Sequence, residues 1–194
     1  MKRDTVTFKS ISSSFLSCEK DIETVLKKLF IQSQPYSDVL KRLLVIQLKD
    51  CLENNSEPII RKIEEMSLAK LIEEGYIRTA PKIRMAEHEK VKSYIIISFD
   101  NFLPDKTNNP YFRDCTISFD IICHTDQWDI GDYRIRPIKI AGYIDGILNE
   151  TKLSGIGTLN FVGMNELVLN EDLAGYTLTY RTTHGNDDKI PGEE

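Results

Sequence analysis

The residues best suited to chemistry lie around position 124, where a cysteine, a histidine and an acid follow one another closely. Cys123, His124 and Asp126 are all residue types that bind transition metals. Adjacent residues of a strand point to opposite faces of the sheet, so Cys123 and His124 cannot both ligate one ion without distortion. We therefore expect no metal site here, and we interpret His124 as a surface histidine.

Three acids spaced three residues apart follow in the expected loop: Asp126, Asp129 and Asp132. A calcium loop requires alternating oxygen ligands and a glycine at a defined position, which this spacing does not supply. We interpret the acids as favourable neighbours of the positive N-terminal end of the next helix. Trp128 is expected at the sheet edge, with a contact to another protein as the alternative.

A further pattern resembles a metal-dependent nuclease signature only in part. Pro104-Asp105 and Glu150-Thr-Lys152 imitate its paired acid and lysine, but Asp105 falls in an expected loop and Lys152 at a helix end. His88 lies in a charged turn and His184 in the expected tail, so neither is placed for a hydrolase triad. The sequence predicts no enzyme, no catalytic residue and no cofactor, with a nuclease as the weakest alternative.

A second alternative is a cytoplasmic adaptor or binding domain with a winged-helix arrangement, in which Ser67–Tyr76 would precede a strand hairpin. A recognition helix should be basic, whereas this one contains Leu71-Ile-Glu-Glu74. The net charge of the chain is −5, which also disfavours a dedicated nucleic-acid binder.

The composition is that of one globular domain with a helical addition. The chain has 194 residues, of which 41 % are hydrophobic and 28 % charged. It contains neither a signal-peptide pattern nor an apolar run long enough for a membrane span. The four cysteines, Cys18, Cys51, Cys115 and Cys123, are interpreted as buried apolar thiols in a reducing compartment.

The elements that must position these residues extend from Tyr111 to Thr183. A strand is predicted by strict alternation, because Cys115, Ile117, Phe119, Ile121 and Cys123 share one parity. A helix from Arg134 to about Asn149 follows, with Pro137 in its opening turn. Two further strands, Ile156–Val162 and Tyr176–Thr183, close the unit, and Glu166–Leu169 is a candidate for a short extra strand.

The N-terminal part is predicted to be helical. Apolar periodicity indicates helices at Glu19–Phe30, at Ser37–Leu52 with Ser37 as its cap, and at Ile59–Glu74 with a break at Ser67. Lys82–Ala86 and Val91–Phe99 then resemble two strands. Asp100–Pro110, with two prolines and three asparagines, is expected to be a long loop.

These elements predict an α+β fold, an antiparallel sheet with one helix packed across a face, preceded by a small helical segment. The expected parts are an N-terminal arm at residues 1–17, the helical segment at 18–80, the α+β domain at 81–183 and a disordered tail at 184–194. The expected core residues are Ile95, Ile97, Ile117, Phe119, Ile121, Ile144, Leu148 and Phe161.

From about Lys82 to Thr183 the chain resembles tail-terminator and head–tail connector proteins of tailed bacteriophages. The segments that carry this resemblance are, in order, YIIISF, FRDCTISFDIICHTD, RIRPIKIAGYIDGILN, TLNFV and YTLTYRTTH. A neck ring protein of a crAss-like or other podovirus-type phage is a related possibility. The resemblance implies a strand–strand–helix–strand–strand order with a long loop between the first two strands. It also implies a virion protein, assembled in the host cytoplasm, that forms a six- or twelve-fold homo-oligomeric ring against neck, portal or tail proteins.

In such a ring the DNA passes through the lumen without sequence-specific binding, and the acidic balance of this chain suits that requirement. Apolar residues in the arm and in the long loop are expected to order against neighbouring subunits, because burial repays the cost of ordering them. The expected subunit-interface residues are Phe8, Phe15, Leu16, Phe102, Leu103 and Trp128.

Overall fold

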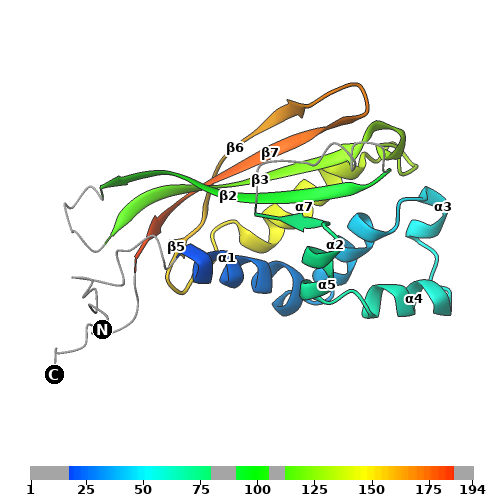
Figure 1. Ribbon diagram of the computed structural model, residues 1–194, viewed down its shortest axis with the longest axis horizontal. Coiled ribbons are helices and arrows are strands. Elements are labelled where there is room, and N and C mark those ends of the chain that lie inside the picture. The colour runs from blue at the N-terminus through cyan, green and yellow to red at the C-terminus, as the bar shows by residue number, and fades with distance from the viewer. Residues whose placement is uncertain (1–17, 80–90, 105–111, 186–194) are drawn as a thin grey trace, which may run out of the picture.

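The computed structural model describes residues 18–79, 91–104 and 112–185, and it confirms an α+β fold. A five-stranded sheet has the order β1-β2-β3-β7-β6, and the helices lie on one side of it (Figure 1). The strands of this sheet are β1 (Ile77–Arg78), β2 (Ser93–Pro104), β3 (Arg113–His124), β6 (Asn160–Val168) and β7 (Leu173–His184). The pairings are antiparallel except for that of β1 with β2.

The N-terminal segment is a series of short helices, as the sequence predicts. They are α1 (Cys18–Lys27), a π-helical turn η2 (Lys28–Gln32), α2 (Tyr36–Val45), α3 (Lys49–Leu52), α4 (Glu57–Glu64) and α5 (Leu68–Glu73). The break at Ser67 is confirmed, because its hydroxyl accepts the Lys70 N–H and caps α5. Gly75, at φ +75°, follows α5 in the left-handed conformation that ends a helix.

The central strand β3 behaves as its alternation predicts. Cys115, Ile117, Phe119, Ile121 and Cys123 are all buried. All but Cys115 belong to the main core, on the side of the helices. Ile122, the one apolar residue of opposite parity, packs on the other face with Tyr94, Ile96 and Leu173. The sheet therefore has a large core on one face and a small apolar cluster on the other.

The helix predicted from Arg134 to Asn149 is α7 (Arg136–Leu148), with Pro137 in its first turn. Ile140, Ile144 and Leu148 are fully buried in the main core, which also includes residues of β3 and β7. Between β3 and α7 lies a short turn of 3-10 helix, η3 (Thr125–Gln127). A helix thus packs across the sheet face, as expected.

The predicted single helix Ser37–Leu52 is wrong, because α2 ends at Val45 and α3 begins only at Lys49. The buried guanidinium of Arg136 accounts for the interruption, because it donates hydrogen bonds to the main-chain carbonyls of Leu43 and Ile46. Ser37 is not a cap and lies inside α2. Leu48, expected on the apolar stripe, is 66 % exposed in the interrupted segment.

The expected loop at residues 100–110 begins later than predicted, because β2 continues to Pro104. The pairing of β2 with β3 is interrupted by a β-bulge between Asp100 and Leu103. Asn101 lies in this bulge and has φ +52°. The Asn101 side-chain amide donates to the Thr116 hydroxyl, which holds the bulge against β3. The remainder of the loop, the predicted strand Lys82–Ala86 and the arm at residues 1–17 lie outside the described residues.

The predicted strand Ile156–Val162 divides into two. β5 (Gly157–Thr158) pairs with β4 (Lys152–Leu153) in a small separate sheet, and β6 begins at Asn160. The expected short strand Glu166–Leu169 is the continuation of β6. Phe161 is not a core residue but 45 % exposed, because β6 is an edge strand of the large sheet; Ile156 and Leu159 are buried instead.

His184 does not belong to a disordered tail. It is the last residue of β7, pairs in register with Arg113 of β3, and is only 1 % exposed. The strand is longer than predicted because its buried parity continues through Leu178, Tyr180 and Thr182 to His184. The tail prediction for residues 186–194 lies outside the described part of the chain.

Candidate functional site

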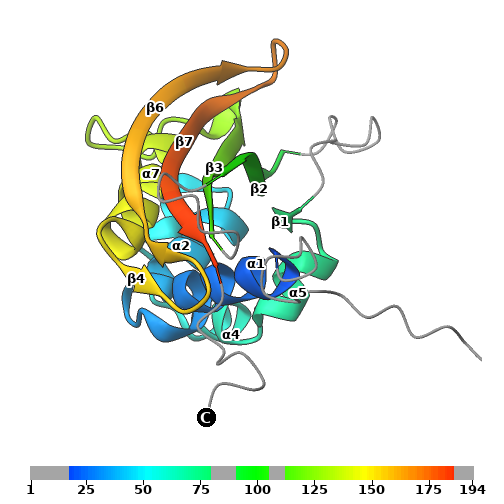
Figure 2. The same cartoon turned by 90° about the vertical axis from the view of Figure 1, so that its left-hand side faces the viewer.

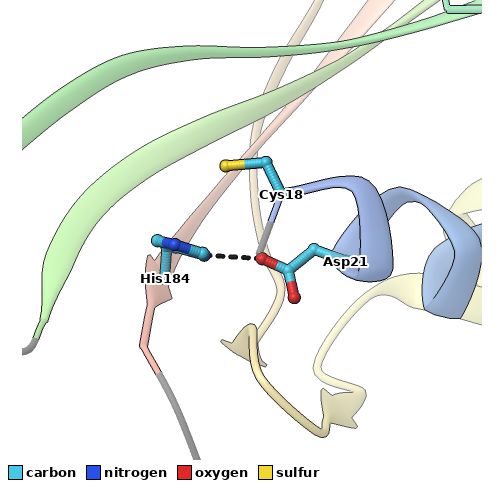
Figure 3. Close-up of side chains that lie close together, drawn as sticks. All are labelled: Cys18, Asp21 and His184. Atoms are coloured by element: carbon cyan, nitrogen blue, oxygen red, sulfur yellow. Dashed lines mark hydrogen bonds and ion pairs between the residues drawn. The ribbon is translucent and has the colours of Figure 1, made fainter. Parts of the chain in front are cut away.

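Three metal-binding residue types meet where the first helix begins and the last strand ends (Figure 3). Cys18 and Asp21 lie in the first turn of α1, and His184 ends β7. Their Sγ, carboxylate oxygen and imidazole nitrogen atoms all lie within 4.8 Å of one another. Asp21 and His184 are buried, and Cys18 is half-buried. We call this group the Cys18–Asp21–His184 cluster.

The Asp21 carboxylate and the His184 imidazole form a direct, buried contact. Nδ1 of His184 lies 2.5 Å from Oδ2 of Asp21, which is closer than the about 2.7 to 2.9 Å of an ordinary charge-assisted N–H···O hydrogen bond. The other carboxylate oxygen, Oδ1, would lie 2.8 Å from a Cβ at Gly155, which has φ +80°. A glycine is therefore required at position 155 both by its backbone conformation and by the close approach of Asp21.

Cys18 is placed beside this pair but is not activated as a nucleophile. Burial raises the pKa of its thiol, the negative charge of Asp21 raises it further, and the positive charge of Arg113 acts in the opposite direction. A nucleophilic cysteine needs the reverse, a lowered pKa and a free imidazole as base, whereas Nδ1 of His184 is engaged by Asp21. The donor set therefore suits cation binding better than covalent catalysis.

The cluster was not predicted because its members are far apart in sequence: His184 and Asp21 are separated by 163 positions. One signal was available, since Leu178, Tyr180, Thr182 and His184 continue a single strand parity. That alternation places the His184 side chain on the buried face. Nothing in the local sequence indicates which helix lies opposite it.

The residues around position 124 are arranged as their alternation predicts. Cys123 is fully buried in the main core, whereas His124 is half-buried on the opposite face. The Asp126 N–H donates to Nδ1 of His124 at 3.3 Å. Cys123 and His124 are therefore not brought together as ligands.

None of the three acids of the loop caps the N-terminus of α7 by a side-chain hydrogen bond. The Asp129 carboxylate accepts the Gly131 N–H at 2.8 Å, which, with the nearby charge of Lys49, lowers its pKa. Asp132 pairs with Arg134. The first N–H of α7, that of Arg136, instead donates to the Trp128 carbonyl at 2.8 Å.

The expected interface residues fall into three groups. Phe8, Phe15 and Leu16 lie outside the described residues. Trp128 is half-buried against the core of its own chain, donating from Nε1 to the Cys123 carbonyl at 3.3 Å. Phe102 packs edge-on against the His184 ring at 5.9 Å, and Leu103 is 59 % exposed near the end of β2.

A second surface feature, not predicted, is an apolar row along β6. Phe161, Met164 and Val168 pair across the sheet with Tyr180, Leu178 and Ala174 of β7, so they lie on the same face as the main core. They are nevertheless exposed, with Val168 at 65 %. Figure 2 shows β6 and β7 curving together away from α1 and α4. We call Phe161, Met164 and Val168 the β6 row.

The residues of the two alternative functions are not gathered into a site within the described ranges. Glu150 lies in a turn after α7 at φ +59°, Lys152 begins β4, and Asp105 is not described. The candidate recognition helix α5 has only six residues, and Glu73 and Glu74 at its end are exposed. Within the described ranges, the helices are too short or too polar to cross a membrane.

A protein-family model covers most of this chain. The family model YomW matches residues 37–182, about three quarters of the chain, from α2 to nearly the end of β7. The β6 row lies inside the matched segment, whereas Cys18, Asp21 and His184 lie just outside it. Among curated proteins, none matches this chain.

Proposed function

Because the chain belongs to the YomW family, a family of the Bacillus phage SPBeta region, it is a phage-derived protein, and we propose that it is a structural virion subunit. In this proposal it forms a homo-oligomeric ring in the phage neck, as a head–tail connector or tail terminator around the DNA channel. Its neighbours would be neck, portal or tail proteins, and it would reach the virion after assembly in the host cytoplasm.

The observation that carries the proposal is the β6 row. An edge strand presents unpaired main-chain N–H and C=O groups, and β6 adds three large apolar side chains on the core-facing side. Its nine residues include a single charged residue, Glu166, and neither lysine nor proline, the residues that usually protect an edge from pairing. Such a surface is stabilised when another chain covers it, and a second copy of this protein is the occupant we propose.

A closed ring requires each subunit to use two different surfaces, because a contact of one patch with itself gives only a two-fold dimer. The second surface we propose is the groove where α2 ends and α4 passes, lined by Val45, Leu48, Cys51 and Ile59. Leu48 projects there from the segment that Arg136 holds out of helical conformation. Leu103, exposed near the end of β2, is a further candidate contact.

The lumen of the ring must let DNA pass without gripping it. The net charge of −5 serves this requirement through repulsion between like charges. The exposed acids Glu73 and Glu74 at the end of α5 give that part of the helical layer the same character. No sequence-specific contact to DNA and no membrane contact is part of the proposal.

The mass of the native assembly tests the proposal directly. Native mass spectrometry of the full chain, over a range of protein concentrations, is expected to show one closed species of six or twelve copies. Labelling of phage particles with an antibody to this chain is expected to mark the neck. A protein that stays monomeric and is missing from purified particles would overturn the proposal and favour the adaptor alternative.

A further inference from the structure

The Cys18–Asp21–His184 cluster has the composition of a metal site. A thiolate, a carboxylate and an imidazole are the ligand types that zinc takes from proteins, commonly in a tetrahedral arrangement. Cys18 and Asp21 are separated by three positions, so they lie on one face of α1 about a turn apart. His184 approaches from β7, and the ligands therefore come from two elements that the fold brings together (Figure 3).

The distances fit a site that needs only small movements. Metal–ligand bonds of about 2.0 to 2.3 Å and tetrahedral angles place donor atoms roughly 3.3 to 3.7 Å apart. The three donor atoms lie within 4.8 Å of one another, and the contact of His184 with Asp21 at 2.5 Å would open by roughly 0.8 Å. Rotations about side-chain bonds at the start of α1 supply movements of this size.

The charges of the three side chains favour the cluster with a bound cation over the cluster without one. Asp21 is buried, and the two groups that face it in the cluster are a thiol and an imidazole, while the positive charge of Arg113 lies near Cys18 outside the donor set. A divalent ion with one thiolate, one carboxylate and a neutral imidazole has no net charge, so burial of the loaded site costs little. Oδ1 of Asp21 is held near Gly155, which leaves Oδ2 directed at His184 and toward the position of the ion.

We propose that Cys18, Asp21 and His184 bind a divalent zinc-class ion, with water or a further donor in the fourth position. The ion would join the first turn of α1 to the last residue of β7, and so act as a structural staple between the two ends of the described chain. This inference does not depend on ring formation. It uses residues outside the segment that the YomW model matches.

Cobalt serves as the spectroscopic probe, because a thiolate bound to Co²⁺ gives an intense charge-transfer absorption in the near ultraviolet. The full chain is stripped with a chelator, kept reduced and titrated with Co²⁺. The expected result is a charge-transfer band that saturates at one equivalent, and that Zn²⁺ then abolishes by displacing cobalt. A protein that gives no such band holds a buried acid–histidine pair only, and the proposal is overturned.

The ligands are assigned with variants. Cys18→Ser is expected to remove the charge-transfer band, and Asp21→Asn and His184→Gln to weaken Co²⁺ binding by at least about tenfold. Cys51→Ser, which changes a half-buried cysteine elsewhere, is the matched control and should keep the band. A band that persists in Cys18→Ser contradicts the assignment.

A second measurement uses the unaltered chain, so it tests the proposal even if the variants fail to fold. Zn²⁺ is expected to slow alkylation of Cys18 at least about tenfold, because the bound thiolate is no longer free to react. Cys51 in the same sample should react at an unchanged rate. Equal alkylation of Cys18 with and without Zn²⁺ would overturn the proposal as firmly as the absence of the cobalt band.

Discussion

Nη1 of Arg136 donates a hydrogen bond of 2.7 Å to the main-chain carbonyl of Leu43, although 93 positions separate the two residues. The same guanidinium donates to Ile46, Gln47 and Gln127. Arg136 has no exposed surface, and burial lowers its pKa. One buried cation in α7 therefore satisfies carbonyls left open where α2 ends, and it joins α7 and η3 to the end of α2.

Replacement of Arg136 by methionine is expected to destabilise the protein strongly. Methionine can replace the aliphatic part of the arginine side chain but has no donor, so several buried carbonyls lose their partners at once. Each buried, unsatisfied group costs about 1–3 kcal/mol, so we expect a total loss of at least about 3 kcal/mol in urea unfolding. Arg134→Met is the matched control, since Arg134 pairs with Glu53 at the surface and should change stability little.

Two phenylalanines pack against the same tyrosine, one from the core and one from an edge strand, so truncating each compares the two positions. Phe119 and Phe161 both meet the Tyr180 ring edge-on, with centroids 5.8 and 5.9 Å away. Phe119→Ala leaves a cavity and is expected to cost about 3–5 kcal/mol of unfolding free energy. Phe161→Ala is expected to cost about 1 kcal/mol or less, because the side chain is already partly hydrated. Similar losses for both would show that β6 is covered within its own subunit.

The features that sequence predicted well are those that local periodicity determines. The alternation of β3 fixed which side chains are buried, since each residue from Cys115 to Cys123 faces the side that its parity requires. The apolar face of α7 follows in the same way from Ile140, Ile144 and Leu148. In both elements one face is buried along its whole length, so the pattern carries enough information.

The features that sequence missed depend on contacts between distant segments. α2 ends early because the Arg136 guanidinium donates hydrogen bonds to its main-chain carbonyls. Phe161 is exposed because β6 is an edge strand, a position that only the strand order of the sheet reveals. The contact of His184 with Asp21 joins opposite ends of the chain, so local sequence does not indicate it. The candidate metal site and the β6 row are therefore properties of the tertiary fold.

The buried thiol of Cys123 is expected to make stability depend on alkaline pH. Burial raises its pKa to about 11 from an ordinary value of 9.0, while a hydrogen bond with Ser93 and the charge of Arg136 act in the opposite direction. The folded protein therefore holds a proton that the unfolded chain releases between these values, so its contribution to stability is complete below pH 9 and lost toward pH 11.

At about pH 10 the loss attributable to Cys123 should reach about 1.4 kcal/mol relative to about pH 8. Urea unfolding of the unaltered protein and of Cys123→Ala, both kept reduced, measures this as the difference between their pH dependences. The comparison is needed because Tyr180, whose pKa is raised by burial and by its hydrogen bond with Asp145, acts in the same direction in both proteins. Parallel pH profiles would mean that the Cys123 thiol is not desolvated.

Charges placed on the β6 row are expected to dissociate the ring without unfolding the subunit. Met164 and Val168 are exposed in the subunit, so the double variant Met164→Glu/Val168→Glu should keep its unfolding midpoint nearly unchanged. In an assembled ring the same carboxylates would be buried without partners, so native mass spectrometry should show monomers in place of the closed species. Ile72→Glu, a change at an equally exposed isoleucine on α5, controls for added negative charge and should assemble normally. A double variant that forms the same assembly as the unaltered protein would show that β6 is not a subunit contact.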